Sequence, residues 1–242
     1  MNLYKKLQKY TIEDAIYFEE IDRQFLALKR LYEGKKIDNG NYLFLIVANS
    51  LICYQLSWKW EDYWEEFSKV LENKSFNNFE EIYIFFSDFI ANSKNNKRFI
   101  ETKLKRILKL EKFYDKFLEN YESYYKNINW KNGMELLVSD LSKIMNQKKE
   151  AKTIVFAVKM FSYWARNIFG LEYFSDNIMI PIDSRLEKLY MEYNLSTEDF
   201  SPLQIKNFYI ELSKKLNIPL LHLDAILWVN YENLLSSKWS TW

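Results

Sequence analysis

Apolar residues recur at spacings of three and four along almost the whole chain, and this spacing is typical of helices with one buried face. It predicts helices over residues 12–32, 41–57, 61–72, 78–91, 96–125 (as one helix or two), 133–145, 151–169, 183–193, 202–217 and 220–236. In the first of these, Tyr17, Ile21, Leu28 and Leu31 form one stripe, which Gln24 interrupts. No segment shows the alternation of a half-buried strand, so we expect an all-α fold.

The composition agrees with long helices, because the chain has only four glycines and three prolines. Its 242 residues suffice for one or two compact domains with a sizeable core. The formal net charge is +1, so a nucleic-acid partner would require positive charge to be concentrated on one face. Between residues 94 and 109, Glu101 is the only acidic residue. The basic residues of this stretch are Lys94, Lys97, Arg98, Lys103, Lys105, Arg106 and Lys109.

The chain has one cysteine, Cys53, and one histidine, His222. These counts exclude a disulfide framework and a four-cysteine zinc or iron–sulfur site, and they argue against histidine-based metal centres and a Ser-His-Asp triad. Any chemistry must therefore use Lys, Asp, Glu or Tyr. The N-terminal segment lacks the apolar core of a signal peptide, and the most apolar run, residues 42–56, is too short to span a bilayer. We therefore expect a cytoplasmic protein without membrane association.

Two lysines stand out in the apolar run AKTIVFAVKM at residues 151–160. Lys152, Phe156 and Lys159 are spaced to share one helix face. The polar turn NQKKE, residues 146–150, precedes them and predicts a hairpin of two helices. Backbone N–H groups at such a turn can hold a phosphate, and Lys148 and Lys149 add positive charge there.

The position of Lys152 in a first helical turn suggests a nucleophile. The positive helix end, burial and the nearby Lys159 would all lower its amine pKa, towards the value of about 7–8 that suits a catalytic lysine. A neutral amine can attack carbon at neutral pH. The alternative is that both lysines extend from the helix edge and bind only phosphate or water.

Two carboxylates have candidate roles. Asp183, in the segment IMIPIDSRL, follows a proline and precedes a helix, so it is placed to cap that helix. It could equally be a rigid carboxylate that faces a cationic transition state. Asp224 and Trp228 share one helix face. The carboxylate could read the edge of a flat base while the indole ring stacks on it. The alternative is a core tryptophan beside a solvated aspartate.

Gln24 and Trp64 are weaker candidates when taken alone. A glutamine in an apolar stripe is more often hydrogen-bonded to the backbone than to a ligand. Trp64 lies in the aromatic segment WEDYWEEF, residues 60–67.

Taken in order, the polar turn, the Lys-Thr pair that opens an apolar helix and the Ile-Pro-Ile-Asp-Ser-Arg segment resemble the helix-hairpin-helix DNA glycosylases. The runs AKTIVFAVKM, IPIDSR and DRQFLALK and the late Asp-x-x-x-Trp are more specifically similar to the archaeal 8-oxoguanine DNA glycosylase family (AGOG). The resemblance covers nearly the whole chain. It implies an all-α fold of two helical subdomains with the active site in the cleft between them. The central subdomain would comprise approximately residues 33–152 and end in the hairpin. The second subdomain would comprise approximately residues 1–32 plus 153–242.

The resemblance also implies roles for individual residues. Lys152 is similar to the Schiff-base lysine of the family and Asp183 to its catalytic aspartate. Lys148 and Lys149 would contact the DNA backbone. The groups around the flipped base would be an aromatic pair and four polar residues: Phe156, Trp228, Gln24, Trp64, Lys159 and Asp224.

The implied activity is that of a bifunctional DNA glycosylase/AP lyase of base excision repair, with no metal or cofactor. It would act as a monomer, at the nucleoid, on double- or single-stranded DNA that contains oxidised guanine. Two features depart from the superfamily: the turn at 146–150 has no glycine, and Lys152 and Asp183 lie 31 residues apart, farther than in its iron–sulfur members. The alternatives are the same fold acting on another damaged base or an abasic site, and a non-catalytic helical module that binds DNA or protein.

Overall fold

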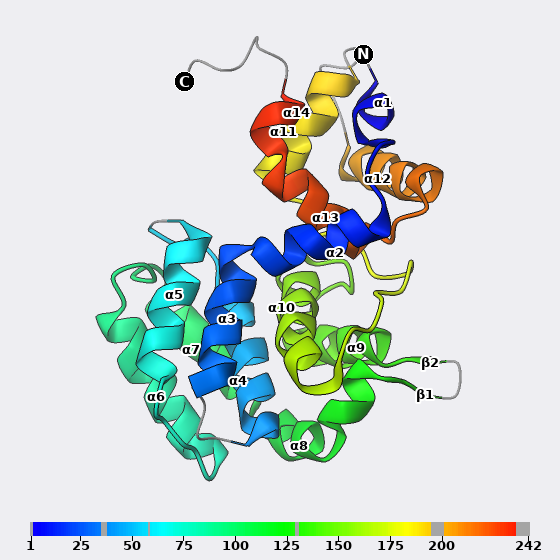
Figure 1. The fold of residues 1–242 in the computed structure, drawn as a ribbon. Helices are drawn as coiled ribbons and strands as arrows, with labels where there is room; N and C mark the ends of the chain where they lie inside the picture. Colours follow the sequence, from blue (N-terminus) through cyan, green and yellow to red (C-terminus); the bar gives the residue numbers. More distant parts are fainter. Residues whose placement is uncertain (1, 35–37, 58, 129–130, 195–200, 236–242) are drawn as a thin grey trace. The chain divides into compact units, whose positions relative to one another are not determined.

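The computed structural model describes residues 2–34, 38–57, 59–128, 131–194 and 201–235. Helices make up nearly all of its regular structure (Figure 1), which confirms the all-α prediction. The exception is a pair of two-residue strands, β1 (Asn127–Ile128) and β2 (Lys131–Asn132), which pair antiparallel. Within the described ranges, no helix is long and apolar enough to cross a membrane.

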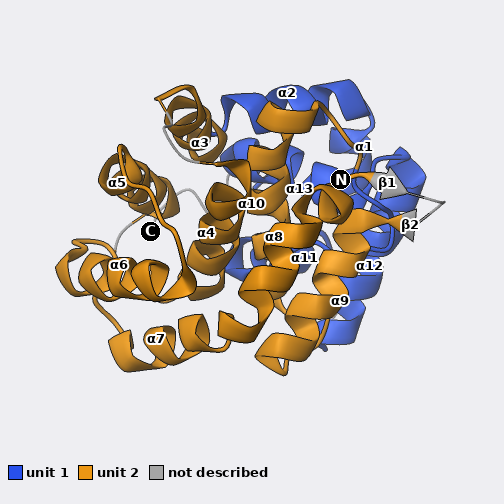
Figure 2. Cartoon of the chain, turned by 90° about the horizontal axis from the view of Figure 1, so that it is seen from below, with its two compact units in different colours: residues 1–22, 174–242 blue, residues 23–173 orange. Residues whose placement is uncertain are grey.

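The chain divides into two compact units (Figure 2). Unit 1 comprises residues 1–22 and 174–242, and unit 2 comprises residues 23–173. The helices of unit 2 are α3 (Arg23–Gly34), α4 (Asn39–Ile52), α5 (Trp60–Leu71), α6 (Phe79–Asn92), α7 (Ile100–Leu108), α8 (Glu111–Tyr125), α9 (Gly133–Met145) and α10 (Lys152–Phe169). Those of unit 1 are α1 (Leu3–Leu7), α2 (Ile12–Ile21), α11 (Ser184–Tyr193), α12 (Pro202–Leu216), α13 (Leu220–Val229) and α14 (Tyr231–Leu234).

These units differ from the subdomain boundaries expected near residues 32 and 152. The sequence-based division assigns α3 and nearly all of α10 to the second subdomain, whereas in the structure both helices belong to unit 2. The physical reason is packing, because α10 lies against α3, α4 and α9.

Helix α4 is the core of unit 2, and each of its residues from Gly40 to Ile52 is buried. Helices α7, α8 and α10 pack against it. Tyr42 of α4 stacks on Trp164 of α10, with ring centroids 4.8 Å apart and planes at 8°. Such a pair contributes about 0.5–1.5 kcal/mol beyond its buried area. The most apolar run of the sequence is therefore a core helix.

The only histidine of the chain holds unit 1 together. His222 of α13 is fully buried, and its Nε2 accepts a hydrogen bond from the backbone N–H of Phe174 over 3.1 Å. The ring proton must then sit on Nδ1, which lies 2.8 Å from Oε1 of the buried Glu19 on α2. A neutral imidazole therefore links α2, α13 and the segment that enters unit 1, so His222 has a structural role.

Two predicted helices, 12–32 and 220–236, are each two helices in the structure, and the stretch 96–125, predicted as one helix or two, is two. The helix predicted over residues 12–32 is broken at Asp22, whose backbone is extended, with ψ of 129°. Tyr17 and Ile21 are consequently exposed, so the single stripe proposed from the sequence is wrong for its first half. The remaining breaks, near Leu110 and Asn230, separate α7 from α8 and α13 from α14.

A polar network is buried where α4, α5 and α7 meet. Tyr63 donates to Asn49, and the Nδ2 of Asn96 donates to the Tyr63 hydroxyl over 3.1 Å. The ammonium of Lys103, a fully buried residue, donates to Asn96 Oδ1 and lies 4.9 Å from the ring centroid of Tyr54. Burial lowers the pKa of Lys103 to about 8, and no carboxylate forms an ion pair with it among the described residues. This lysine is therefore part of the core and not of a DNA-binding surface.

The buried Lys103 should make stability depend on pH. Between pH 8 and its ordinary pKa of 10.5, the folded amine loses its proton while the unfolded amine keeps it. The free energy of unfolding of the wild type should then rise relative to that of Lys103→Met, by up to about 1.4 kcal/mol per pH unit. Urea denaturation of both proteins across this range measures the difference. A difference that is constant with pH would contradict an amine titrating in the core.

Candidate active site

The polar turn forms a tight connection between α9 and α10 without a glycine. Asn146 ends α9 in the left-handed conformation, with φ of 50°, and asparagine tolerates this region better than most residues. The N–H groups of Asn146 and Gln147 donate to the carbonyls of Lys143 (3.1 Å) and Ser142 (2.9 Å). This closes the helix end as a glycine would. The predicted hairpin is thus confirmed, and Lys148 and Lys149 on it are exposed.

Helix α10 begins at Lys152, as its place after the turn predicted. The side chain of Lys152 is exposed, while Phe156 and Lys159 on the following turns are buried. The expectation that Lys152 is buried is therefore wrong. The first turn of the helix extends beyond the core, so the side chain stays in contact with solvent. The Lys152 Nζ lies 5.0 Å from the ring centroid of Trp60.

A cavity of about 230 Å³ opens beside this amine. Helix α10 contributes Lys152, Thr153 and Phe156 to its lining, α5 contributes Trp60, and the connection that follows α4 contributes residues 53–55. The Trp60 ring stands edge-on to Phe156, with centroids 4.9 Å apart and planes at 84°. Burial raises the pKa of the Cys53 thiol, so the thiolate is disfavoured. Lys152 carries the only amine in the described lining of this cavity.

Three further residues predicted to contact the base belong to unit 2, and one of them, Trp64, lies beside Phe156. The buried Trp64 of α5 has its ring centroid 6.3 Å from that of Phe156. Its indole N–H makes no regular hydrogen bond among the described residues, although it lies near the thiol of Cys53, a weak acceptor. Gln24 is buried on α3, a helix that packs against both α5 and α10. Lys159 Nζ lies 5.4 Å from the ring centroid of Tyr163.

Asp183 caps α11, as its position after Pro181 predicted. Its Oδ1 accepts hydrogen bonds from the backbone N–H groups of Arg185 (3.0 Å) and Leu186 (3.1 Å). Both bonds fall on one oxygen, and Oδ2 accepts none within the part of the chain that the structure describes. The cap thus fixes the carboxylate and leaves one oxygen available.

Unit 1 brings Asp183 together with two further predicted residues. Asp183, Asp224 and Trp228 line one narrow space of about 10 Å³, which is too small for a base. Asp224 is buried, and the guanidinium carbon of Arg185 lies 3.5 Å from the ring centroid of Trp228. Arg185 therefore covers one face of the Trp228 ring.

The predicted residues thus fall into two groups, one in each unit. One consists of Gln24, Trp64, Lys152, Phe156 and Lys159 in unit 2. The other consists of Asp183, Asp224 and Trp228 in unit 1.

Two aromatic contacts of these residues were not predicted from the sequence: Trp60 with Lys152, and Arg185 with Trp228. Trp60 lies four residues before Trp64, and this spacing was the available signal for its place on the same helix face. Arg185 follows Asp183 by two residues, and its place in the segment IMIPIDSRL was the available signal for it. Their contacts with Lys152 and Trp228 depend on tertiary packing.

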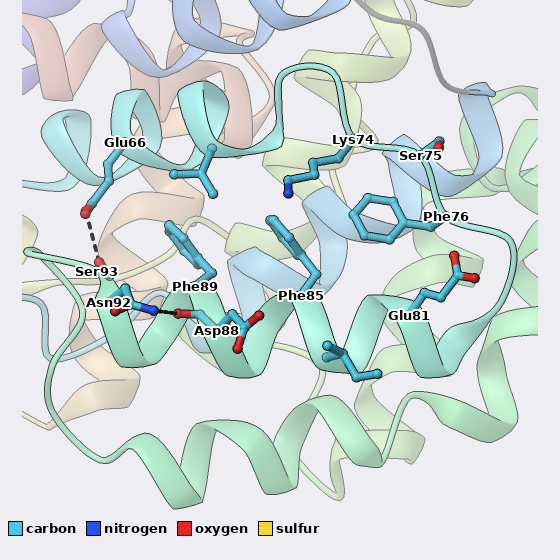
Figure 3. Close-up of a pocket in the computed structure, with 12 residues that line it drawn as sticks. Glu66, Lys74, Ser75, Phe76, Glu81, Phe85, Asp88, Phe89, Asn92 and Ser93 are labelled. Carbon is cyan, nitrogen blue, oxygen red and sulfur yellow. Dashed lines mark hydrogen bonds between the residues drawn. The ribbon is translucent and has the colours of Figure 1, made fainter.

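A larger pocket, of about 420 Å³, lies between α5 and α6 of unit 2 (Figure 3). Its apolar lining includes Phe85 and Phe89, and its charged lining is three carboxylates (Glu66, Glu81 and Asp88) with one ammonium, that of Lys74. Glu66 accepts a hydrogen bond from the Ser93 hydroxyl over 2.9 Å. None of the predicted site residues lines this pocket, and its excess of negative charge disfavours a phosphate backbone. The smaller cavity at Lys152 is therefore the better candidate site.

No group of three or more His, Cys, Asp and Glu residues is arranged to hold a metal ion in the described ranges.

Comparisons with known proteins identify the family of the chain. The family model AGOG, described as N-glycosylase/DNA lyase, matches residues 4–240. The chain is 40% identical over 213 residues to the N-glycosylase/DNA lyase of Methanococcus maripaludis, covering 87% of this chain and 78% of that protein. It is 38% identical over 228 residues to the N-glycosylase/DNA lyase of Nanoarchaeum equitans, covering 93% and 88%.

The fold is similar to a crystal structure of Pa-AGOG, the 8-oxoguanine DNA glycosylase from Pyrobaculum aerophilum, in complex with 8-oxoguanosine. The TM-score is 0.77 with 24% sequence identity, and the match covers 98% of this chain and 88% of that one. This likeness supports the all-α fold of the sequence prediction. With the family model matching nearly its whole length, the chain belongs to the AGOG family of N-glycosylase/DNA lyases.

Proposed function

We propose that this chain removes 8-oxoguanine from DNA and then cuts the strand at the resulting abasic site. Family membership supports glycosylase and lyase chemistry, and the Pyrobaculum aerophilum relative supports the choice of base. The observation that carries the proposal is the position of Lys152. Its amine lies at the first turn of α10, on a cavity lined otherwise by aromatic rings and uncharged groups.

The reaction begins when the damaged nucleotide leaves the base stack, because its glycosidic bond is out of reach inside a duplex. Phe156 and Trp228 are proposed to hold the flipped base between their rings. Since Arg185 covers one face of Trp228, the base must take the opposite face or displace the guanidinium. Stacking on an aromatic ring is worth about 1–3 kcal/mol and offsets part of the cost of unstacking.

The neutral amine of Lys152 then attacks C1′ of the sugar while the C1′–N9 bond breaks, and the base leaves with that bond's electron pair and takes up a proton. Opening of the sugar ring gives a Schiff base between C1′ and the lysine nitrogen. Loss of a proton from C2′ expels the 3′ phosphate by β-elimination, and water finally releases the lysine. The Oδ2 atom of Asp183 is proposed to stabilise the positive charge that develops on the sugar.

The remaining polar groups are proposed to recognise the edge of the base: Gln24, Trp64, Lys159 and Asp224. Lys148 and Lys149 are exposed on the hairpin, where they would bind backbone phosphates, so that affinity falls as salt rises. The basic residues between 94 and 109 would add to this contact with the phosphates, except for Lys103, which is buried. We further propose that the protein acts as a monomer in the cytoplasm, at the nucleoid, on double- or single-stranded DNA.

Borohydride trapping tests the nucleophile. A duplex that contains 8-oxoguanine should give a covalent adduct with the wild type and none with Lys152→Ala, because reduction traps only the Schiff base. The Lys159→Gln protein should still be trapped on a preformed abasic site and should be slower on 8-oxoguanine. An adduct that persists in Lys152→Ala would show that another residue is the nucleophile, and Lys159 would be the next candidate.

The same assay identifies the substrate. Duplexes with uracil or an oxidised pyrimidine should give less adduct than 8-oxoguanine under equal conditions. Preference for one of these bases would replace the proposed lesion, and absence of any adduct with every duplex would indicate a non-catalytic DNA-binding module.

Asp183→Asn separates the chemical role of this residue from its capping role. Asparagine caps a helix about as well as aspartate, so the variant should fold and bind DNA normally. The rate of base removal in a single turnover should fall by about 100-fold or more, because a charge that faces the transition state is lost. The matched Asp183→Ala protein should in addition lose about 1 kcal/mol of stability with the cap. Loss of folding in Asp183→Asn would show that the residue is structural.

Trp228→Ala tests the aromatic sandwich. In a Lys152→Ala background, which prevents turnover, the substitution should weaken binding of an 8-oxoguanine duplex by about 1–3 kcal/mol. Fluorescence anisotropy with damaged and undamaged duplexes measures the effect, and Leu203→Ala, at an exposed position of α12, is the control. An equal loss for both duplexes would argue against stacking on the flipped base.

A further inference from the structure

Arg106 of α7 reaches the hairpin that carries the proposed nucleophile. Its Nη2 donates to Gln147 Oε1 over 3.0 Å and to Thr153 Oγ1 over 3.1 Å. The Thr153 hydroxyl in turn donates to Gln147 Oε1 over 3.1 Å. Three side chains thus close a ring of hydrogen bonds. This ring joins the turn to the residue that directly follows Lys152.

The two ends of the turn are held in different ways. On the α9 side, backbone bonds from Asn146 and Gln147 close the helix, and the Ser142 hydroxyl donates to the Gln147 carbonyl over 2.6 Å. On the α10 side, the N-cap position is Ala151, which provides no side-chain cap. The contacts of Arg106 therefore fasten the start of α10 where a capping side chain would ordinarily do so.

Arg106 also supports the far wall of the Lys152 cavity. Its guanidinium carbon lies 5.7 Å from the ring centroid of Tyr54, and Lys103 lies over the same ring. Tyr54 and Thr153 both line the cavity. One side chain thus contacts both the wall beside Lys152 and the wall contributed by the connection after α4.

The environment of Arg106 is costly for a guanidinium. Its Nε is buried without a hydrogen-bond partner, and no carboxylate forms an ion pair with it among the described residues. Burial lowers the pKa of Arg106 from its ordinary value. A half-buried cation without a carboxylate costs stability, which favours a functional reason for its presence over a structural one.

We propose that Arg106 is a positioning residue for Lys152: its fork of hydrogen bonds to Gln147 and Thr153 sets the first turn of α10, and with it the direction of the amine into the cavity. The proposal rests on the proposed function. A planar guanidinium suits this task because it can donate to two acceptors in a fixed geometry, which a lysine ammonium cannot.

The competing explanation is that Arg106 binds a DNA phosphate. The two explanations predict different measurements, because positioning acts on the rate of the bound complex and a phosphate contact acts on affinity. A displacement of about 1 Å at a reacting group can lower a rate by about 100-fold. Loss of one phosphate contact weakens binding. It also reduces the slope of log affinity against log salt concentration by about one.

The test compares Arg106→Met and Arg106→Lys with the wild type and with Arg30→Met, a control at an exposed arginine of the same unit. Single-turnover base removal at saturating enzyme gives the rate. Titration of a duplex with a stable abasic-site analogue, over a range of salt, gives the affinity. We expect rates at least about 10-fold lower for both Arg106 variants, with affinity and salt dependence unchanged within about twofold. Arg30→Met should match the wild type.

Coupling to the hydrogen-bonded partner gives a second readout. Thr153→Val removes the hydroxyl and keeps the shape, so it should lower the rate in the wild type and add little in Arg106→Met, since both remove the same contact. If Arg106→Met fails to fold, Thr153→Val alone carries the test. Wild-type rates in the variants, or weaker binding with a smaller salt dependence at a normal rate, would overturn the proposal. Absence of any wild-type adduct would instead refute the proposed function.

Discussion

The packing of α10 along α4 is the contact on which the rest of unit 2 depends. Helix α10 is buried from Ile154 to Arg166, so its direction is set by the core. The two lysines of this helix lie in different surroundings, one at the exposed first turn and one buried against a ring. Lys152 takes the first position and Lys159, near Tyr163, the second. The burial that stabilises the unit therefore also determines which lysine is accessible for reaction.

The distribution of charge over the two units has a chemical advantage. Among the residues that the structure describes, no carboxylate lines the Lys152 cavity, whereas Asp183 and Asp224 both line the narrow space in unit 1. A carboxylate beside an amine favours the ammonium form, which cannot attack carbon. Keeping acids out of the lining of this cavity avoids that penalty. Under the proposed mechanism, the carboxylate of Asp183 acts only when positive charge develops on the sugar.

The sequence predicted most of what local rules govern. Periodicity located the helices, and turn chemistry placed Lys152 at a helix start and Asp183 at a cap, because both depend on neighbours in the chain. The break at Asp22, the burial of Lys103 and the exposure of Lys152 depend on contacts between distant segments, and were missed for that reason. The ring of Arg106, Gln147 and Thr153 was missed likewise, since it joins helices more than 40 residues apart.

The absence of glycine from the hairpin illustrates a weakness of reading motifs by composition. What the turn requires is a left-handed backbone, and Asn146 supplies it. The constraint is one of conformation, so a residue other than glycine can end α9 at this point.

The two least frequent reactive side chains make the units separately observable. The only cysteine, Cys53, is fully buried in unit 2, and the only histidine, His222, is fully buried in unit 1. The Cys53 side chain has no exposed surface although it lines the Lys152 cavity, so opening of unit 2 should speed its reaction with a thiol reagent. The imidazole of His222 gives one set of magnetic-resonance signals, which reports on the packing of unit 1. The chain thus contains one intrinsic probe in each half. Opening of either unit during DNA binding can be followed without introducing a label.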